Sequence, residues 1–262
     1  MMDDPLPLSL LVLACTLAAA AAGFALRRRL GPAPDADQSR EGVRMAMGLM
    51  TTFTASVLGM VTASAKETYD QATAVVTGTA VDMITLDRKL DNYGPEAAGA
   101  RAEVRVCVDR MIERMQSGER YFEDNKRATE VGTSIERLWS AIHVLKPADG
   151  RQTDLRDQAL AILSGRVKYG PGNIEQQRWA FAVKPASVPR NFLIVVVAWL
   201  LLEFFALGIF FPRSRAMSVA ITIAGLVVAS SMFLILELED PLTGAMRVPV
   251  ESLELARDLL GR

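Results

Sequence analysis

The stretch NFLIVVVAWLLLEFFALGIFF, at Asn191–Phe211, decides the fold class of this chain. An apolar run of about 20 residues is long enough to cross the hydrocarbon core of a bilayer as an α-helix. Glu203 interrupts the run close to its middle. A carboxylate at that depth costs about 2.5–3.5 kcal/mol to insert, and it therefore faces a partner or a water-filled space. The chain is predicted to be an integral membrane protein with a polar position inside the membrane.

Three further apolar segments bring the predicted number of membrane helices to four. They are Leu6–Leu26, Val43–Ala63 and Met217–Leu236, and the second is the least hydrophobic. Acidic residues precede the first segment and Arg27–Arg29 follow it. A secretory signal peptide carries its positive charge before the apolar run, so this segment is predicted to be a retained anchor.

The arginines beside these segments predict an orientation. They gather in two short loops: Arg27, Arg28, Arg29, Arg40 and Arg44 in the first, Arg213 and Arg215 in the second. The positive-inside rule places both loops in the cytoplasm. The N-terminus, the long hydrophilic region and the C-terminal tail of this multi-pass inner (plasma) membrane protein are then predicted to be extracytoplasmic.

Composition excludes several functions. The chain has 262 residues, of which 50% are hydrophobic, and a formal net charge of −1, so a strongly basic nucleic-acid binder is excluded. One histidine and two cysteines leave no ordinary His/Cys zinc site. No nucleophile, metal or phosphate motif is present. We therefore expect no enzymatic activity, no metal and no cofactor.

The predicted fold is all-α throughout. Residues 1–63 hold the first two membrane helices, residues 64–190 a helical extracytoplasmic insert, residues 191–236 the last two membrane helices, and residues 237–262 an acidic turn and an amphipathic C-terminal helix. Apolar residues recur every three to four positions in the insert, and no alternating strand pattern occurs, which is typical of an antiparallel helical bundle.

Polar positions inside the membrane are the first candidates for function. Small residues share one face of the second segment: Gly48, Thr52, Ser56, Gly59 and Ala63. This face predicts either a pore wall that exposes the hydroxyls of Thr52 and Ser56, or close packing against another helix. Glu203 is either a protonated acid that bonds Thr52, Thr222 or Ser230, or a pore-lining or proton-relay carboxylate.

Charged residues outside the membrane have simpler interpretations. Glu237, Glu239 and Asp240 could hold Ca²⁺, but three acids rarely suffice, and a solvated helix end is the favoured interpretation. Lys66 is a candidate partner for Glu237. Asp82, Asp91 and the Asp87-Arg88 pair are interpreted as solvated or ion-paired side chains on one helix.

Four stretches together resemble a known family. They are SVLGMVTASAKETYD (Ser56–Asp70), ITLDRKLDNYGPEA (Ile84–Ala97), QRW (Gln177–Trp179) and LELEDPLTGAMRVPVESL (Leu236–Leu253). The combination is similar to the bacterial bestrophin-like domain family of membrane proteins. The residues that carry the resemblance as structural candidates are Lys66, Tyr69, Asp70, Asp87, Arg88, Gly94, Pro95, Glu237, Asp240, Pro241 and Gly244. The chain departs from the family pattern at Glu239-Asp240-Pro241-Leu242, where Asp-x-Pro-Phe is usual, and at Glu203, where an apolar residue is expected.

The resemblance implies paired membrane helices around a helical insert and, through bestrophins, an oligomeric ion channel. It also implies the opposite side of the membrane for the insert. The sequence thus leaves two functions open: an oligomeric channel or transport-like protein, or a non-conducting sensor or scaffold whose insert binds an extracytoplasmic protein or ligand. The expected partners are membrane lipid, further copies of the chain and that extracytoplasmic partner.

Overall fold

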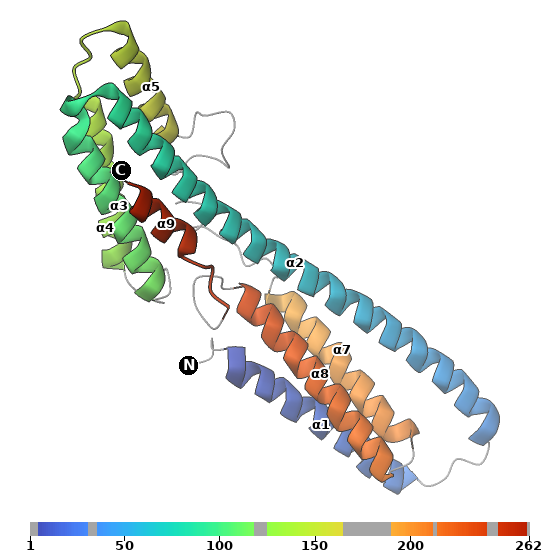
Figure 1. Cartoon of the computed structure of the whole chain (residues 1–262). Coiled ribbons are helices and arrows are strands. Elements are labelled where there is room, and N and C mark those ends of the chain that lie inside the picture. Colours follow the sequence, from blue (N-terminus) through green and yellow to red (C-terminus); the bar gives the residue numbers. More distant parts are fainter. Residues whose placement is uncertain are drawn as a thin grey trace. The chain divides into compact units, whose positions relative to one another are not determined.

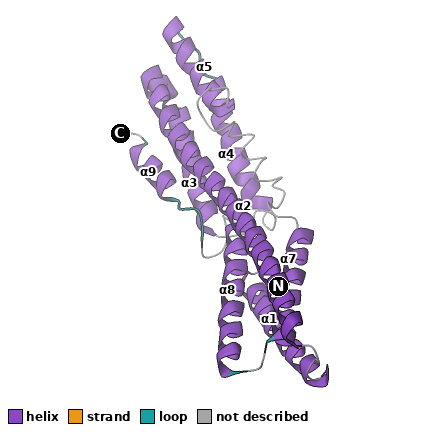
Figure 2. Cartoon of the chain, turned by 90° about the vertical axis from the view of Figure 1, so that its right-hand side faces the viewer, coloured by secondary structure: helices purple, strands orange, loops and turns teal. Residues whose placement is uncertain are grey.

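The structure, a computed structural model, describes residues 5–30, 36–117, 125–164, 190–211, 214–239 and 246–260. These residues are almost entirely helical, and none of them lies in a strand (Figure 2). The chain divides into two compact units. The first comprises Met1–Thr68 and Ala186–Glu239, and the second comprises Tyr69–Pro185 and Asp240–Arg262. The all-α prediction is confirmed for the described part of the chain.

Among the residues that the structure describes, four helices are long and apolar enough to span a membrane, as predicted. They are α1 (Pro5–Leu30), α2 (Ala36–Tyr93), α7 (Arg190–Phe210) and α8 (Arg215–Glu239) (Figure 1). The second of them is far longer than its predicted membrane segment, because α2 continues without a break for 58 residues and belongs to both units. No glycine or proline interrupts the sequence between Ala63 and Val76, so nothing there ends the helix.

In the first unit, α1 packs against α7 and α8 through small and apolar side chains. Ala20, Phe204 and Ile221 form the buried centre of this contact. Gly23 of α1 and Gly208 of α7 bring the two backbones together: a Cβ on either glycine would lie 3.0 Å from the other's Cα. Small residues permit such an approach, and close packing is what holds helices together in lipid.

The second unit is a helical bundle around one apolar core. It contains the end of α2, η1 (Pro95–Ala97), α3 (Ala98–Ser117), α4 (Asn125–His143), α5 (Gly150–Ser164) and α9 (Glu251–Leu259). The face of α2 that the periodicity predicts to be apolar is buried in this core: Val76, Ala80, Met83, Leu86 and Leu90. The C-terminal helix α9 contacts α3 and adds Leu253 and Ala256 to the same core.

Gly94 ends the long helix α2. Its φ of 129° lies in a region that L side chains rarely adopt, so glycine is favoured at this position. Pro95 opens η1, and the amide of Ala97 donates to the carbonyl oxygen of Gly94 at 3.1 Å. The side-chain amide of Gln152, on α5, donates to the carbonyl oxygen of Tyr93 at 3.0 Å. Hydrogen bonds from η1 and from α5 therefore stabilise the turn.

Candidate functional site

Glu203, on α7, forms a side-chain hydrogen bond with α2 in the first unit. Its Oε1 accepts a hydrogen bond from Thr51 Oγ1 of α2 at 2.5 Å. The three hydroxyls that sequence reasoning named as partners bond inside their own helices instead. Thr52 donates to the carbonyl of Gly48, Thr222 to that of Ser218, and Ser230 to that of Leu226. Since one residue turns a helix by about 100°, the choice between Thr51 and Thr52 depends on how α2 is rotated against α7.

The small-residue face of α2 points away from the other helices of its unit. Met47, Thr54, Val61 and Ala65 are buried, and they share one side of α2. Thr52 lies roughly 140° around the helix from Met47. The members of the small-residue face are all exposed: Gly48, Thr52, Ser56, Gly59 and Ala63. A Cβ added at Gly48 or Gly59 would meet nothing within 4 Å. Within the described residues, this face therefore contacts no other helix.

Large apolar side chains flank the small-residue face on α2. Leu49, Phe53 and Met60 are 63%, 68% and 74% exposed. By helical spacing they follow one another along a neighbouring strip. The membrane part of α2 thus has three distinct sides: one packed, one small with hydroxyls, and one bulky and apolar. The two uncovered sides are available for lipid, for another copy of the chain or for a water-filled path.

The position of Glu237 corrects the sequence interpretation that this residue belongs to a solvated helix end. It is only 3% exposed, so it is not part of a solvated helix end. The reason is that α8 continues to Glu239, and Glu237 lies next to the buried Leu238 on the packed side of that helix. Lys66, Glu67, Asp70, Glu237 and Glu239 all have interaction partners. The pairing of Lys66 with Glu237 stays a prediction.

Asp87 is the centre of an ion-pair cluster in the second unit. Its carboxylate accepts from Arg101 Nε at 2.8 Å and from Arg101 Nη2 at 3.0 Å, and Asp91 binds the same guanidinium. The hydrogen bonds that Arg101 donates to Asp87 raise the pKa of Arg101, while burial acts in the opposite direction. Arg88, the sequence neighbour of Asp87, is exposed. Sequence reasoning missed Arg101. The signal was the spacing of Asp87 and Asp91, which lie one turn apart on the same face of α2 and favour a cationic side chain on a neighbouring helix.

Of the remaining motif residues, some lie in the described part of the chain and some lie outside it. The hydroxyl of Tyr69 donates to the carbonyl oxygen of Arg247 at 3.3 Å, which joins α2 to the segment before α9. Gly94 and Pro95 form the turn described above. Asp240, Pro241, Gly244 and the QRW stretch lie outside the described residues. The described residues contain no cluster of His, Cys, Asp and Glu that could hold a metal ion.

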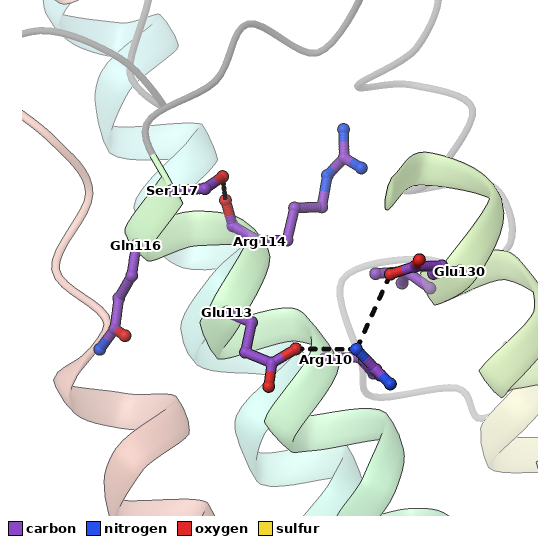
Figure 3. A pocket seen from close by; sticks show the side chains of 7 residues that line it. Arg110, Glu113, Arg114, Gln116, Ser117 and Glu130 are labelled. Atoms are coloured by element: carbon purple, nitrogen blue, oxygen red, sulfur yellow. Dashed lines mark hydrogen bonds and ion pairs between the residues drawn. The ribbon is translucent and has the colours of Figure 1, made fainter. Parts of the chain in front are cut away.

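A cavity of about 480 Å³ lies between α3 and α4 (Figure 3). Arg110 stands between two carboxylates, Glu113 at 3.0 Å and Glu130 at 3.7 Å. Arg114 and Gln116 also line the cavity. Two arginines and two glutamates balance in charge, so the described wall does not favour a ligand of either sign.

One sequence family matches most of the chain, and several solved structures share its fold. A sequence model described as Bestrophin-like domain matches residues 14–253. No curated protein matches the chain in sequence. A solved structure of a bacterial bestrophin homologue from Klebsiella pneumoniae is similar, with a TM-score of 0.66, 17% identity and 96% of each chain covered. A second structure of that homologue has a TM-score of 0.64 and 15% identity, and covers 98% of this chain and 97% of its own. A structure described as a membrane protein has a TM-score of 0.67 and 15% identity, and covers 96% and 95%. At these identities the structures show a shared fold.

Proposed function

Because the chain belongs to the bestrophin-like family and is a multi-pass membrane protein, we propose that it assembles into an oligomer that conducts ions. The observation that carries the proposal is the exposed small-residue face of α2, which has hydroxyls at Thr52 and Ser56. Small residues in membrane helices gather where helices meet closely, and this face meets no helix of its own unit in the described residues. Further copies of α2 around a central axis would give it a partner.

The three sides of α2 suit a ring of copies. Its packed side holds the subunit together. The small side, with Thr52 and Ser56, would face the axis, where hydroxyls can replace part of an ion's water shell. The bulky side, with Leu49, Phe53 and Met60, would pack against the neighbouring copy or narrow the path.

Glu203 has a distinct role in this proposal. Its bond to Thr51 ties α7 to α2. An intramembrane acid so close to the small-residue face is suited to tune the ions that pass. The family resemblance leads us to expect an apolar residue at this position, so we do not extend this role to other members of the family.

The orientation we propose follows the arginines. Arg27, Arg28, Arg29 and Arg44 would be cytoplasmic. Residues 64–190 and 237–262 would then lie on the extracytoplasmic side of the inner (plasma) membrane. A cysteine in place of Val144, which is 75% exposed, tests this in a chain without Cys15 and Cys107. Labelling by an impermeant maleimide in intact spheroplasts supports the orientation, and protection reverses it.

Assembly is tested first. The mass of the complex in lipid nanodiscs, corrected for bound lipid, should correspond to a closed ring of several copies. A monomer or dimer would contradict a central pore, and it would leave the non-conducting sensor or scaffold as the better proposal.

Conduction is tested in liposomes that contain the purified protein. The double variant Thr52→Ala with Ser56→Ala should change ion flux or its selectivity, whereas Thr222→Ala with Ser230→Ala should not. The control removes the same number of hydroxyls from α8, where they also bond their own helix. Glu203→Gln should alter the pH dependence of flux. Equal flux in all variants and wild type would contradict both the role of the Thr52 and Ser56 hydroxyls and the role of Glu203 in conduction.

A further inference from the structure

Exposed arginines gather at one end of the first unit. α1 ends in Arg27, Arg28 and Arg29, and α8 begins with Arg215 at the same end (Figure 1). Arg28, Arg29 and Arg215 are exposed. Arg27 is fixed differently, because its Nη1 donates to the carbonyl oxygen of Ile209 at 3.4 Å, in the last turn of α7. The ends of α1 and α7 are thereby joined, next to the contact of Gly23 with Gly208.

Arg44 of α2 lies at the same level. The bond from Thr51 to Glu203 sets α2 and α7 in register, and the two helices run in opposite directions (Figure 1). Arg44 precedes Thr51 by seven residues, and Phe210 follows Glu203 by seven, which is about 10 Å along each helix. Arg44 is therefore level with the end of α7. It is exposed as well.

We name Arg28, Arg29, Arg44 and Arg215 the basic end. No described carboxylate forms an ion pair with these four arginines, and Glu41 is the nearest acid in the described sequence. Their positive charge adds to that of the α8 N-terminus, where Ser214 Oγ accepts from the amide of Met217. Exposed apolar side chains begin directly beside them, at Leu26, Met45 and Phe210. Arginines that lie directly beside exposed apolar side chains are typical of the boundary between the lipid headgroups and the acyl chains of a bilayer.

We propose that the basic end binds the headgroups of anionic phospholipids in the leaflet that it faces. Guanidinium groups bind phosphate oxygens in a bidentate manner, and each arginine near an anionic membrane surface contributes favourable energy. Bound headgroups would neutralise the ends of α1, α2 and α8 together and hold these helices against α7. The binding requires only membrane insertion, so it stands whether or not the protein conducts ions.

The experiment measures how lipid protects the full-length protein in neutral detergent from thermal unfolding. Phosphatidylglycerol, phosphatidylcholine and inorganic phosphate are titrated separately. Phosphatidylglycerol should raise the unfolding midpoint at concentrations where phosphatidylcholine of the same chain length does not. High salt should weaken the difference. Inorganic phosphate alone should fail to reproduce it, because it lacks the acyl chains that reach Leu26, Met45 and Phe210.

Variants locate the binding. The double variant Arg28→Gln with Arg29→Gln should weaken the apparent affinity for phosphatidylglycerol about tenfold or more. The control, Arg137→Gln with Arg151→Gln, removes two exposed arginines from the second unit and should retain the preference. Arg28→Lys with Arg29→Lys keeps the charge and should retain most of it, and Arg215→Gln supplies a milder change if the double variant fails to fold. Equal protection by both lipids, an equal effect of phosphate, or an unchanged preference in the Gln variants would each overturn the proposal.

Discussion

Gly23 and Gly208 touch backbone to backbone where α1 crosses α7. A Cβ at Gly23 would lie 2.2 Å from the carbonyl oxygen of Phe205, and a Cβ at Gly208 would lie 2.2 Å from that of Ala20. Neither carbonyl can move without moving its helix. Gly23→Ala or Gly208→Ala should therefore force the helices apart at a cost of about 3 kcal/mol, and lower the thermal unfolding midpoint in detergent.

Gly99→Ala is the matched control for this crossing. Gly99 lies in α3, and a Cβ there would meet nothing within 4 Å. Alanine is the better helix former, so this variant should be as stable as wild type or more stable, by up to about 1 kcal/mol. If Gly23→Ala behaved like Gly99→Ala, the close crossing would not exist in the folded protein.

The Asp87–Arg101 pair gives the second prediction. The Asp87 side chain is 7% exposed, and Arg101 holds it through two hydrogen bonds. Asp87→Asn should lower the free energy of unfolding by about 1.5–3 kcal/mol, because it weakens two hydrogen bonds between charged groups and takes the main counter-charge from the partly exposed guanidinium of Arg101. Asp91→Asn changes the same charge at a side chain that is 57% exposed, and should cost under about 1 kcal/mol. Similar losses in both variants, measured by chemical denaturation, would contradict a dominant role for Asp87.

Helical periodicity explains why much of the fold could be predicted. Long apolar runs define membrane helices, because only a helix satisfies its own backbone in lipid. The three-to-four spacing from Val76 to Leu90 predicts which side of α2 is buried, and the structure buries that side. Glycine and proline mark helix ends, as Gly94 and Pro95 do.

Side-chain pairs between helices could not be predicted in the same way. Glu203 pairs with Thr51, whereas Thr52, Thr222 and Ser230 were the expected candidates, and Asp87 pairs with Arg101 across the turn at Gly94. Both pairs depend on the rotation and crossing of two helices, which the periodicity of either helix leaves undetermined. Glu237 was misjudged for a related reason, because its burial depends on neighbours distant in the sequence.

Tyr93 provides a prediction about an unmet hydrogen bond. Its side chain is 3% exposed, and its hydroxyl has no hydrogen-bond partner in the described residues. Burial raises the pKa of this phenol. Tyr93→Phe removes a polar group that was desolvated without compensation, so the free energy of unfolding should stay the same or rise by about 1 kcal/mol.

Tyr69→Phe is the control, with the opposite expectation. It deletes the hydroxyl that donates to Arg247, so chemical denaturation should show a loss of about 0.5–1 kcal/mol. A loss in Tyr93→Phe as large as that in Tyr69→Phe would indicate that the Tyr93 hydroxyl has a partner in solution.

Asp82 predicts a pH dependence. Burial raises the pKa of this half-buried carboxyl above its ordinary value of 3.8. At pH 3 the carboxyl is protonated in both the folded and the unfolded chain, so its burial carries no charge penalty. As pH rises above 3.8, the unfolded chain ionises first, and folding loses free energy until the folded carboxyl ionises too. Asp82→Asn should therefore raise the unfolding midpoint at pH 7 and leave it nearly unchanged at pH 3. An equal gain at both pH values would assign the effect to packing.

Cys107 reports on the integrity of the second unit. It is fully buried in the core, and burial, with a smaller effect of Glu103, raises the pKa of its thiol to about 12. At pH 8 only about one thiol in ten thousand is then ionised, and the thiolate is the form that reacts. In a Cys15→Ser chain, Cys107 should resist iodoacetamide until the unit unfolds, whereas a cysteine in place of the exposed Val144 should react within minutes. The same burial makes stability fall above pH 9, where the unfolded thiol ionises and the folded one does not. Rapid alkylation of Cys107 in the native protein would show that the core around α3 opens to solvent.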